Sequence, residues 1–489
     1  MRIVAIVFIA LLTFACSTKK TGEELAKENC SSCHKFPDPS LLDKKTWNDK
    51  VLVDMSYRLG MRNKFELAAQ IPEEQFQTAV AMKIYPDTPA MSVEDWQAIV
   101  DYYVTNAPEN PLPQKTKSPI LTAPLHFKQE DFLSSTLQAG HVTSVKIHPS
   151  KSEAWLGLNT NETLILDSKL QVNSTLRTPS PNVHTAFLQN SHYLLSVGKI
   201  LPNDEKLGAL YEVQHKNKLV PLVDGLKRPV DMQVADFTGD GTMDFLICEY
   251  GFQAGQLVWV DGKTKERHIL KSQPGARNIH ITDYTKDGKP DILVLMAEAN
   301  EGVSLFINKG NGMFVEKPLL QFDVVWGSSY MDVADVNKDG FDDLIISNGD
   351  NADNSIVKKA YHGVHLFLND GKNNFKETYF YPAYGATKTL ARDYDGDGDI
   401  DLAMIAFFPE NDHGKNESFL YFQNQGNLRF QVSNLNLPDD ARYMAMDAGD
   451  FDKDGDIDLL LGNFQFGKPK PGVKLTPGLQ IRLLRNTIR

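Results

Sequence analysis

The chain has 489 residues, of which 42% are hydrophobic and 23% are charged, and its 63 acidic and 51 basic side chains give a net charge of −12. This composition is that of a soluble globular protein and excludes fibrous, disordered and polytopic membrane proteins. The acidic balance argues against nucleic acid or an anionic membrane surface as the main partner. Four cysteines are too few for a disulfide framework in a chain of this length.

The first 16 residues predict a cleaved export signal. A short basic start is followed by an apolar run over 3–12, which is too short to span a bilayer, and then by Ala15 and Cys16. A small residue before a cysteine resembles the lipobox of bacterial lipoproteins, and the resemblance implies a lipid on Cys16. In that family Ser17 after the cysteine favours the outer membrane. An ordinary signal peptide with an incidental cysteine is the alternative.

Residues 30–34 contain the motif C-x-x-C-H, which is the attachment signature of c-type haem. The thiols of Cys30 and Cys33 can add to two vinyl groups on one porphyrin edge, and His34 then supplies the proximal iron ligand. A thioredoxin-type pair would need a βαβ context, and a zinc site would need a second Cys or His pair nearby; the surrounding sequence has neither. We therefore predict one covalent haem c.

The domain around this motif, residues 17–107, is predicted to be helical. Apolar residues recur every four positions between residues 42 and 59, and Ser92 with Asp95 forms a capping box before an aromatic-rich last helix. The arrangement resembles the class I cytochrome c domain. That resemblance implies a methionine as the sixth iron ligand.

Four methionines are candidates for this ligand, and the resemblance favours one of them. Met55 follows Trp47 by about two turns, as the ligand does in small cytochromes, and Met91 is second because it stands just before the last helix. Met61 and Met82 are the remaining candidates, and core packing is the alternative role for each. Residues 108–122, which contain four prolines, are predicted to form a stiff linker.

Five later segments share one loop pattern, with oxygen-bearing side chains at positions 1, 3, 5 and 9 and glycine at position 6. Calcium prefers six to eight oxygen ligands, and glycine permits the sharp turn around it. Position 12 is apolar in all five, which excludes an EF-hand, and a strand follows. We predict up to five Ca²⁺ ions, bound most tightly by loops four and five; metal-free Asp-Gly hairpins are the alternative. The predicted ligands are Asp236, Thr238, Asp240 and Asp244; Asp283, Thr285, Asp287 and Asp291; Asp335, Asn337, Asp339 and Asp343; Asp393, Asp395, Asp397 and Asp401; and Asp450, Asp452, Asp454 and Asp458.

The loops begin 47, 52, 58 and 57 residues apart, and a second hairpin recurs within each unit. Four strands in about 50 residues is the size of a propeller blade. Strand pairs over 142–158 and 184–197 predict two further blades without metal loops. The last unit lacks an outer strand, which we expect residues 125–132 to supply. The predicted fold is thus a small all-α class I cytochrome c domain followed by an all-β, seven-bladed propeller over 123–489.

The five loops resemble the FG-GAP/VCBS repeat family. Together with the haem motif, they make the chain similar to cytochrome c–VCBS fusion proteins of bacterial cell envelopes. The resulting hypothesis is an exported monohaem electron carrier with a calcium-stabilised propeller as binding scaffold, a redox protein as its partner and no catalytic residues. A quinoprotein-like dehydrogenase is one alternative. Adhesion or glycan binding is the other, with the polar insertions 348–362 and 409–418 shaping the site.

Overall fold

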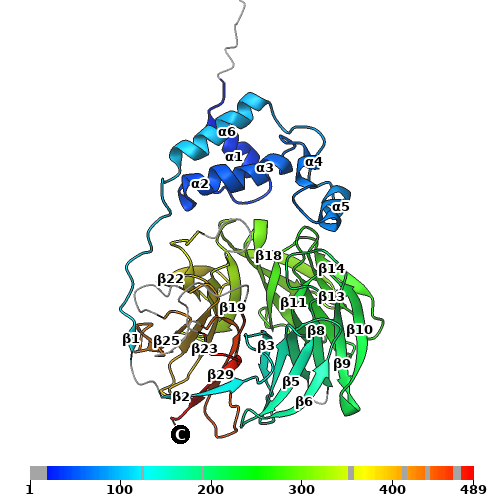
Figure 1. Ribbon diagram of the computed structural model, residues 1–489, viewed down its shortest axis with the longest axis vertical. Coiled ribbons are helices and arrows are strands. Elements are labelled where there is room, and N and C mark those ends of the chain that lie inside the picture. Colours follow the sequence, from blue (N-terminus) through cyan, green and yellow to red (C-terminus); the bar gives the residue numbers. More distant parts are fainter. Residues whose placement is uncertain are drawn as a thin grey trace, which may run out of the picture.

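The computed structural model describes residues 19–122, 126–188, 191–350, 357–409, 416–435, 441–465 and 475–488. It contains an N-terminal helical domain seated on one face of a β-propeller (Figure 1). Within the described residues, no helix is long and apolar enough to cross a membrane. The predicted signal segment 1–16, with its lipidation site Cys16, lies outside these residues.

The helical domain starts and ends with capped helices. Thr21 and Glu24 form a capping box at the start of the first helix, and Ser92 accepts a hydrogen bond from the Asp95 N–H at 3.1 Å, as the sequence predicts. The apolar residues spaced by four lie on one nearly continuous helical stretch that contains a π-helical turn. The elements are α1 (Gly22–Cys30), η1 (Pro39–Leu41), α2 (Lys44–Thr46), η2 (Trp47–Val51), α3 (Leu52–Arg58), α4 (Lys64–Leu67), α5 (Glu73–Ala81) and α6 (Val93–Asn106).

Two aromatic residues organise the core of this domain. The side chains of Trp47 and Tyr103 are buried, each with 1% of its surface exposed, and their ring centroids lie 4.5 Å apart. Each also satisfies its polar atom, because Trp47 Nε1 donates to the Pro39 carbonyl at 2.8 Å and the Tyr103 hydroxyl donates to the Pro37 carbonyl at 2.9 Å. These bonds fix the chain that leaves the C-x-x-C-H motif against helices η2 and α6.

The rest of the described chain forms seven sheets around a central axis, which confirms the predicted seven-bladed propeller. We number the blades one to seven by their first strands, and the two blades without metal loops come first, as expected. The strands are β3 (Val142–Ile147), β4 (Glu153–Leu158), β5 (Glu162–Asp167) and β6 (Val172–Arg177); β7 (Asn182–Leu188), β8 (Ser191–Ser196), β9 (Gly208–Gln214) and β10 (Lys218–Leu226); β11 (Pro229–Ala235), β12 (Asp244–Glu249), β13 (Gln256–Val260) and β14 (Arg267–Lys271); β15 (Ala276–Thr282), β16 (Asp291–Met296), β17 (Gly302–Asn308) and β18 (Phe314–Gln321); β19 (Ser328–Ala334), β20 (Asp343–Asn348), β21 (Gly363–Asn369) and β22 (Phe375–Pro382); β23 (Ala386–Arg392), β24 (Asp401–Ala406), β25 (Phe419–Asn424) and β26 (Phe430–Asn434); and β27 (Tyr443–Gly449), β28 (Asp458–Asn463) and β29 (Leu479–Asn486).

Blade seven is completed by a strand from the start of the propeller domain. Strand β2 (Phe127–Leu133) pairs antiparallel with β29, from Phe127 opposite Asn486 to Leu133 opposite Leu479. This confirms the predicted ring closure, although Leu125 lies outside the described residues. We call this pairing of β2 with β29 the seam of the ring. Buried Arg482 stabilises it, because its Nε and Nη2 donate to the two carboxylate oxygens of Asp131 at 2.8 and 3.0 Å.

Neighbouring blades are also joined along the axis by acidic side chains of the first strands. Asp231 accepts the Ile279 N–H of the next blade, and Asp332 accepts the Ala391 N–H, each at 2.8 Å. Asp447 accepts the Ile147 N–H at 2.8 Å, which links blade seven to blade one. These charge-assisted bonds repeat around the axis and hold the blades in register.

The proline-rich segment between the domains is anchored along its second half. Lys117 forms an ion pair with Glu417 at 2.7 Å, and the Tyr381 hydroxyl donates to the Ser118 carbonyl at 3.2 Å. The segment then forms β1 (Leu121–Thr122), which pairs in parallel with β26 as a fifth strand of blade six. The expected spacer is therefore held against the propeller over these residues.

The two faces of the ring carry different features. Turns alternate between the faces because the strands of each blade are antiparallel. The helical domain contacts connections between second and third strands and between blades; for example, Gln75 donates to the Pro202 carbonyl at 2.7 Å. The metal loops join first and second strands and therefore lie on the opposite face. The predicted insertions 348–362 and 409–418 belong to the helix-side face, with 351–356 and 410–415 outside the described residues.

Candidate haem and metal sites

The C-x-x-C-H motif lies where helix α1 ends. Cys30 is half-buried and packs against the core cluster of the helical domain, Cys33 is exposed, and His34 is half-buried. The Nδ1 of His34 lies 2.9 Å from the Lys35 carbonyl. A metal-ligating histidine usually gives its second ring N–H to such an acceptor, and this arrangement leaves Nε2 available for iron. The residues present therefore fit a proximal haem ligand beside two attachment thiols.

The environment of Cys30 does not favour a thioredoxin-type redox pair. Burial raises the pKa of the Cys30 thiol, whereas an attacking redox cysteine needs a lowered pKa. The motif also follows a helix and precedes the short turn η1, so the described chain around it has no βαβ unit.

The four candidate methionines differ in their surroundings. Met55 on α3 and Met91 just before α6 both pack against the core cluster that also includes Cys30. Met61 is half-buried outside that cluster, and Met82 is 48% exposed. Packing therefore sets Met55 and Met91 apart from the other two, and the choice of Met55 over Met91 stays a prediction.

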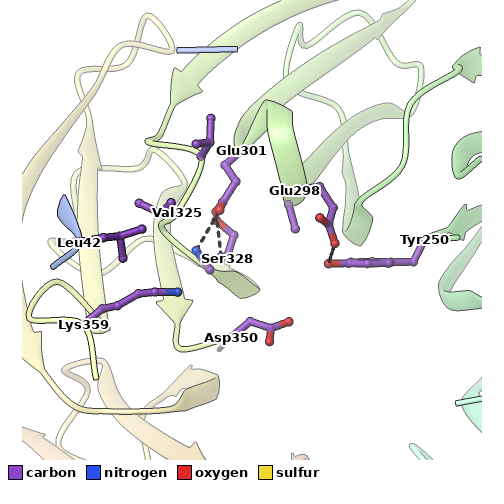
Figure 2. Close-up of a pocket in the computed structure, with 11 residues that line it drawn as sticks. Leu42, Tyr250, Glu298, Glu301, Val325, Ser328, Asp350 and Lys359 are labelled. Atoms are coloured by element: carbon purple, nitrogen blue, oxygen red, sulfur yellow. Dashed lines mark hydrogen bonds between the residues drawn. The ribbon is translucent and has the colours of Figure 1, made fainter. Parts of the chain in front are cut away.

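A cavity of about 60 Å³ lies between the two domains, close to this cluster (Figure 2). Leu42 of the helical domain lines it together with Val325, Glu298 and Glu301 of the propeller. Glu301 is only 3% exposed, and burial raises its pKa to about 7. This cavity could not be predicted from the sequence, because its lining residues come from segments hundreds of positions apart.

Glycine at position 6 of each metal loop has the backbone conformation that the loop requires. Its φ is positive in all five loops, from 83° at Gly288 to 103° at Gly455. In loops one to four its N–H donates to the first aspartate, at 2.8 Å from Gly241 to Asp236 and at 3.0 Å from Gly398 to Asp393. The loop backbone thus wraps around the first carboxylate.

The aspartate at position 9 has a second role that the sequence analysis missed. All five are at most 1% exposed. In loop two, the carboxylate oxygens of Asp291 accept the N–H groups of Thr285 at 2.9 Å and Asn308 at 2.8 Å. In loop five, Asp458 accepts those of Phe451 at 3.0 Å and Asn486 at 2.8 Å. Each such aspartate ties its metal loop to the end of the third strand of the same blade or to the turn that follows it.

A recurrent asparagine at the end of the third strand is the sequence signal for this tie. In blades four to seven the ninth aspartate accepts the N–H of this asparagine. These residues are Asn308, Asn369, Asn424 and Asn486.

Carboxylates converge most closely in loops four and five. Among the described residues, Asp393, Asp395 and Asp401 offer oxygens within 4.8 Å of one another, and so do those of loop five, Asp450, Asp452 and Asp454. Asp450 and Asp452 each have a buried Oδ1 without a hydrogen-bond partner. Buried acceptors of this kind fit ligation of a hard cation such as Ca²⁺.

Basic side chains stand beside carboxylates in several of the loops. Lys289 pairs with Asp287 at 2.7 Å in loop two, and Lys263 lies 3.7 Å from Asp240 in loop one. Lys338 likewise pairs with Asp399 in loop four, and Arg485 with Asp452 in loop five. These ion pairs therefore do not rank the loops, and tightest binding by loops four and five stays a prediction.

The comparisons with known proteins identify the repeats of the propeller. Three stretches of the chain match the FG-GAP-like repeat. They cover residues 236–294, 283–346 and 393–461 and so include all five metal loops. Blades three to seven thus carry FG-GAP-like repeats, and no curated protein matches the chain.

Solved structures similar to this chain include two from fungi. An S. cerevisiae structure of Dbp5 bound to Nup159, Gle1, IP6 and ADP matches with a TM-score of 0.45 and 13% identity, over 76% of this chain and 99% of that chain. The Neurospora crassa Pan2 WD40 domain matches with a TM-score of 0.44 and 11% identity, over 66% of this chain and 86% of that chain.

Proposed function

We propose that this protein is an exported c-type cytochrome with one haem, carried on a calcium-stabilised propeller that serves as a binding scaffold. The observation that supports this most directly is the His34 ring, held through Nδ1 beside two cysteines at haem-attachment spacing. Haem would supply one-electron redox chemistry. Cys30 and Cys33 would hold it covalently, His34 Nε2 would bind the iron, and Met55 would be the sixth ligand.

The protein's own residues would keep this site apolar. Trp47 and Tyr103 pack beside Cys30 and satisfy their polar atoms with backbone carbonyls, so they bring no uncompensated polar group to it. A dry, apolar surround limits access of water to the iron and suits electron transfer rather than ligand activation.

The absorption spectrum of the full chain, produced in a host that matures c-type cytochromes, tests the haem proposal. We expect a covalent haem spectrum that the double variant Cys30→Ala/Cys33→Ala abolishes. Cys248→Ala is the matched control, because Cys248 is fully buried on β12, and it should keep the spectrum. A wild-type protein without covalent haem would refute the proposal.

The calcium proposal rests on the convergent carboxylates of loops four and five. Removing two ligands of one loop, as in Asp450→Ala/Asp454→Ala, should lower the calcium content by one ion per chain, as measured by elemental analysis after equilibrium dialysis. The matched change in loop one, Asp236→Ala/Asp240→Ala, should lower it less, since the carboxylates of loop five converge within 4.8 Å and offer more acidic ligands. Equal losses would contradict this ranking.

Lipid attachment at Cys16 is proposed as the means by which the protein is held in the cell envelope, at the outer membrane. Cys16→Ala should move the protein from the membrane fraction to the soluble envelope fraction. Its redox partner is proposed to be another protein, which cross-linking and co-purification from the native envelope would identify. Retention of the Cys16 variant in the membrane fraction would contradict the lipid anchor.

The quinoprotein alternative gains no support from the space between the domains. Pockets for organic ligands measure roughly 300–1,000 Å³. The described interdomain cavity, at about 60 Å³, is far smaller. Glycan binding through the helix-side insertions is the other alternative. Retention of the protein on immobilised polysaccharides tests it directly.

A further inference from the structure

One propeller loop reaches the helical domain next to the haem motif. Residues 322–328 connect blade four to blade five; they follow strand β18 and end at Ser328, the first residue of β19. Asp323 in this loop pairs with Lys35, the residue after His34, at 3.1 Å. Val325 packs against the core cluster that also includes Cys30 and Met55, and it lines the interdomain cavity with Leu42 (Figure 2).

Contacts within the propeller hold this loop in place. Buried Glu301 accepts the N–H groups of Gly327 and Ser328, each at 2.9 Å, and the Ser328 hydroxyl at 2.6 Å. Trp326 stacks on Phe322 with ring centroids 4.1 Å apart. A loop with this many satisfied bonds is preorganised and holds Val325 in one place.

Tyr361 of blade five joins the loop to the helical domain. Its hydroxyl lies 3.2 Å from the Val325 carbonyl and 3.4 Å from the Leu41 carbonyl, so one side chain spans both. The other described interdomain hydrogen bonds lie further along the interface. They join Gln75 to the Pro202 carbonyl and Arg58 to Gln253, at 2.7 and 3.4 Å. The haem-motif side of the domain is therefore the side where the propeller contributes both an apolar contact and an ion pair.

We infer that loop 322–328 forms one wall of the haem site, with Val325 as its apolar contact and Asp323 as a positioning residue that acts through Lys35. This inference rests on the proposed haem function. It assigns to the propeller a role in setting the haem potential and in limiting access of exogenous ligands to the iron. The two domains would then form a single redox unit.

The direction of each effect follows from electrostatics. Ferric haem carries one more positive charge than ferrous haem, so an apolar wall favours the ferrous form and raises the potential. A carboxylate at position 325 should therefore lower the potential. Asp323→Asn leaves Lys35 without that counter-charge and should raise it, by a smaller shift because the Lys35 side chain is 43% exposed and screened.

Redox titration of the full-length holoprotein tests the inference, together with cyanide binding to the ferric form followed by absorption. We expect Val325→Asp to lower the midpoint potential and to increase the rate of cyanide binding, Asp323→Asn to raise the potential, and Gln75→Ala, the control at the far side of the interface, to change neither. Val325→Ser provides a milder variant with the same expected direction if Val325→Asp does not fold.

The outcomes separate this inference from the function on which it rests. A wild-type chain without covalent haem overturns the proposed function. A haem-loaded, folded Val325 variant with the wild-type potential and the wild-type cyanide-binding rate overturns the inference alone. A Gln75→Ala protein that shifts as much as the Val325 variant also overturns it, because the effect would then belong to docking in general.

Discussion

The ninth aspartate of each metal loop should stabilise the propeller even when calcium is absent, and Asp291 allows a direct test. In Asp291→Ala, the N–H groups of buried Asn308 and exposed Thr285 both lose their acceptor. A buried donor left unsatisfied costs about 1–3 kcal/mol, and the Thr285 N–H can turn to water, so the free energy of unfolding should fall by about 1–3 kcal/mol. The loss should be present in calcium and in chelator, since these bonds involve no metal.

Urea unfolding near neutral pH, in excess calcium and in excess chelator, measures this loss. Asp287→Ala is the matched control in the same loop, because Asp287 is exposed and its loss should cost no more than about 0.5 kcal/mol in chelator. If Asp291→Ala were destabilising only in calcium, the ninth aspartate would be a metal ligand alone and the proposed tie to the end of the third strand would be wrong.

Three further predictions concern the iron ligand, the interdomain carboxyl and the ring closure. Met55→Ala should convert the ferric haem from low spin to high spin in its absorption spectrum, and the same change in Met91→Ala instead would assign the ligand to Met91. The folded-state pKa of Glu301, about 7, is raised above its ordinary value of 4.5 by burial, so its contribution to stability is greatest below pH 4.5 and is lost as the pH rises through 7. Unfolding of Glu301→Gln across this range should show a smaller decline than the wild type, and parallel curves would contradict the assignment. Asp131→Ala removes the bidentate partner of buried Arg482 and should cost about 3–5 kcal/mol in urea unfolding; a loss below about 1 kcal/mol would show that the seam does not depend on this pair.

The propeller could be predicted in detail from the sequence because its signals are local. Each metal loop is nine residues long, and the apolar strand that follows it is continuous with it, so the pattern reports a turn and a buried strand without distant information. The closing strand β2 could also be predicted by counting the strands of each repeat unit. The last unit lacked its outer strand, and an open sheet edge is unfavourable. The helix start at Ser92 was predictable for the same local reason.

The missed features join residues of different structural elements. The tie between Asp291 and Asn308 links two turns of one blade, and the recurrent asparagine does not by itself reveal which carboxylate it meets. The contact between Val325 and the helical core joins positions almost 300 residues apart and leaves no periodic pattern. The proline-rich segment was predicted to be a stiff linker, yet its contacts depend on distant residues, because Lys117 is held by Glu417 of blade six and Ser118 by Tyr381 of blade five.

Residue type and spacing alone therefore predicted the number of blades and the positions of the five repeated loops, which are confirmed, while haem and calcium binding at these motifs stay predictions. Only the tertiary structure decided that the metal loops and the haem motif lie on opposite faces of the ring, and that Asp323 and Val325 stand beside Lys35 and the helical core. The physical reason is that an interdomain contact is selected by shape and charge across two surfaces. Neither surface carries that information in its own sequence pattern.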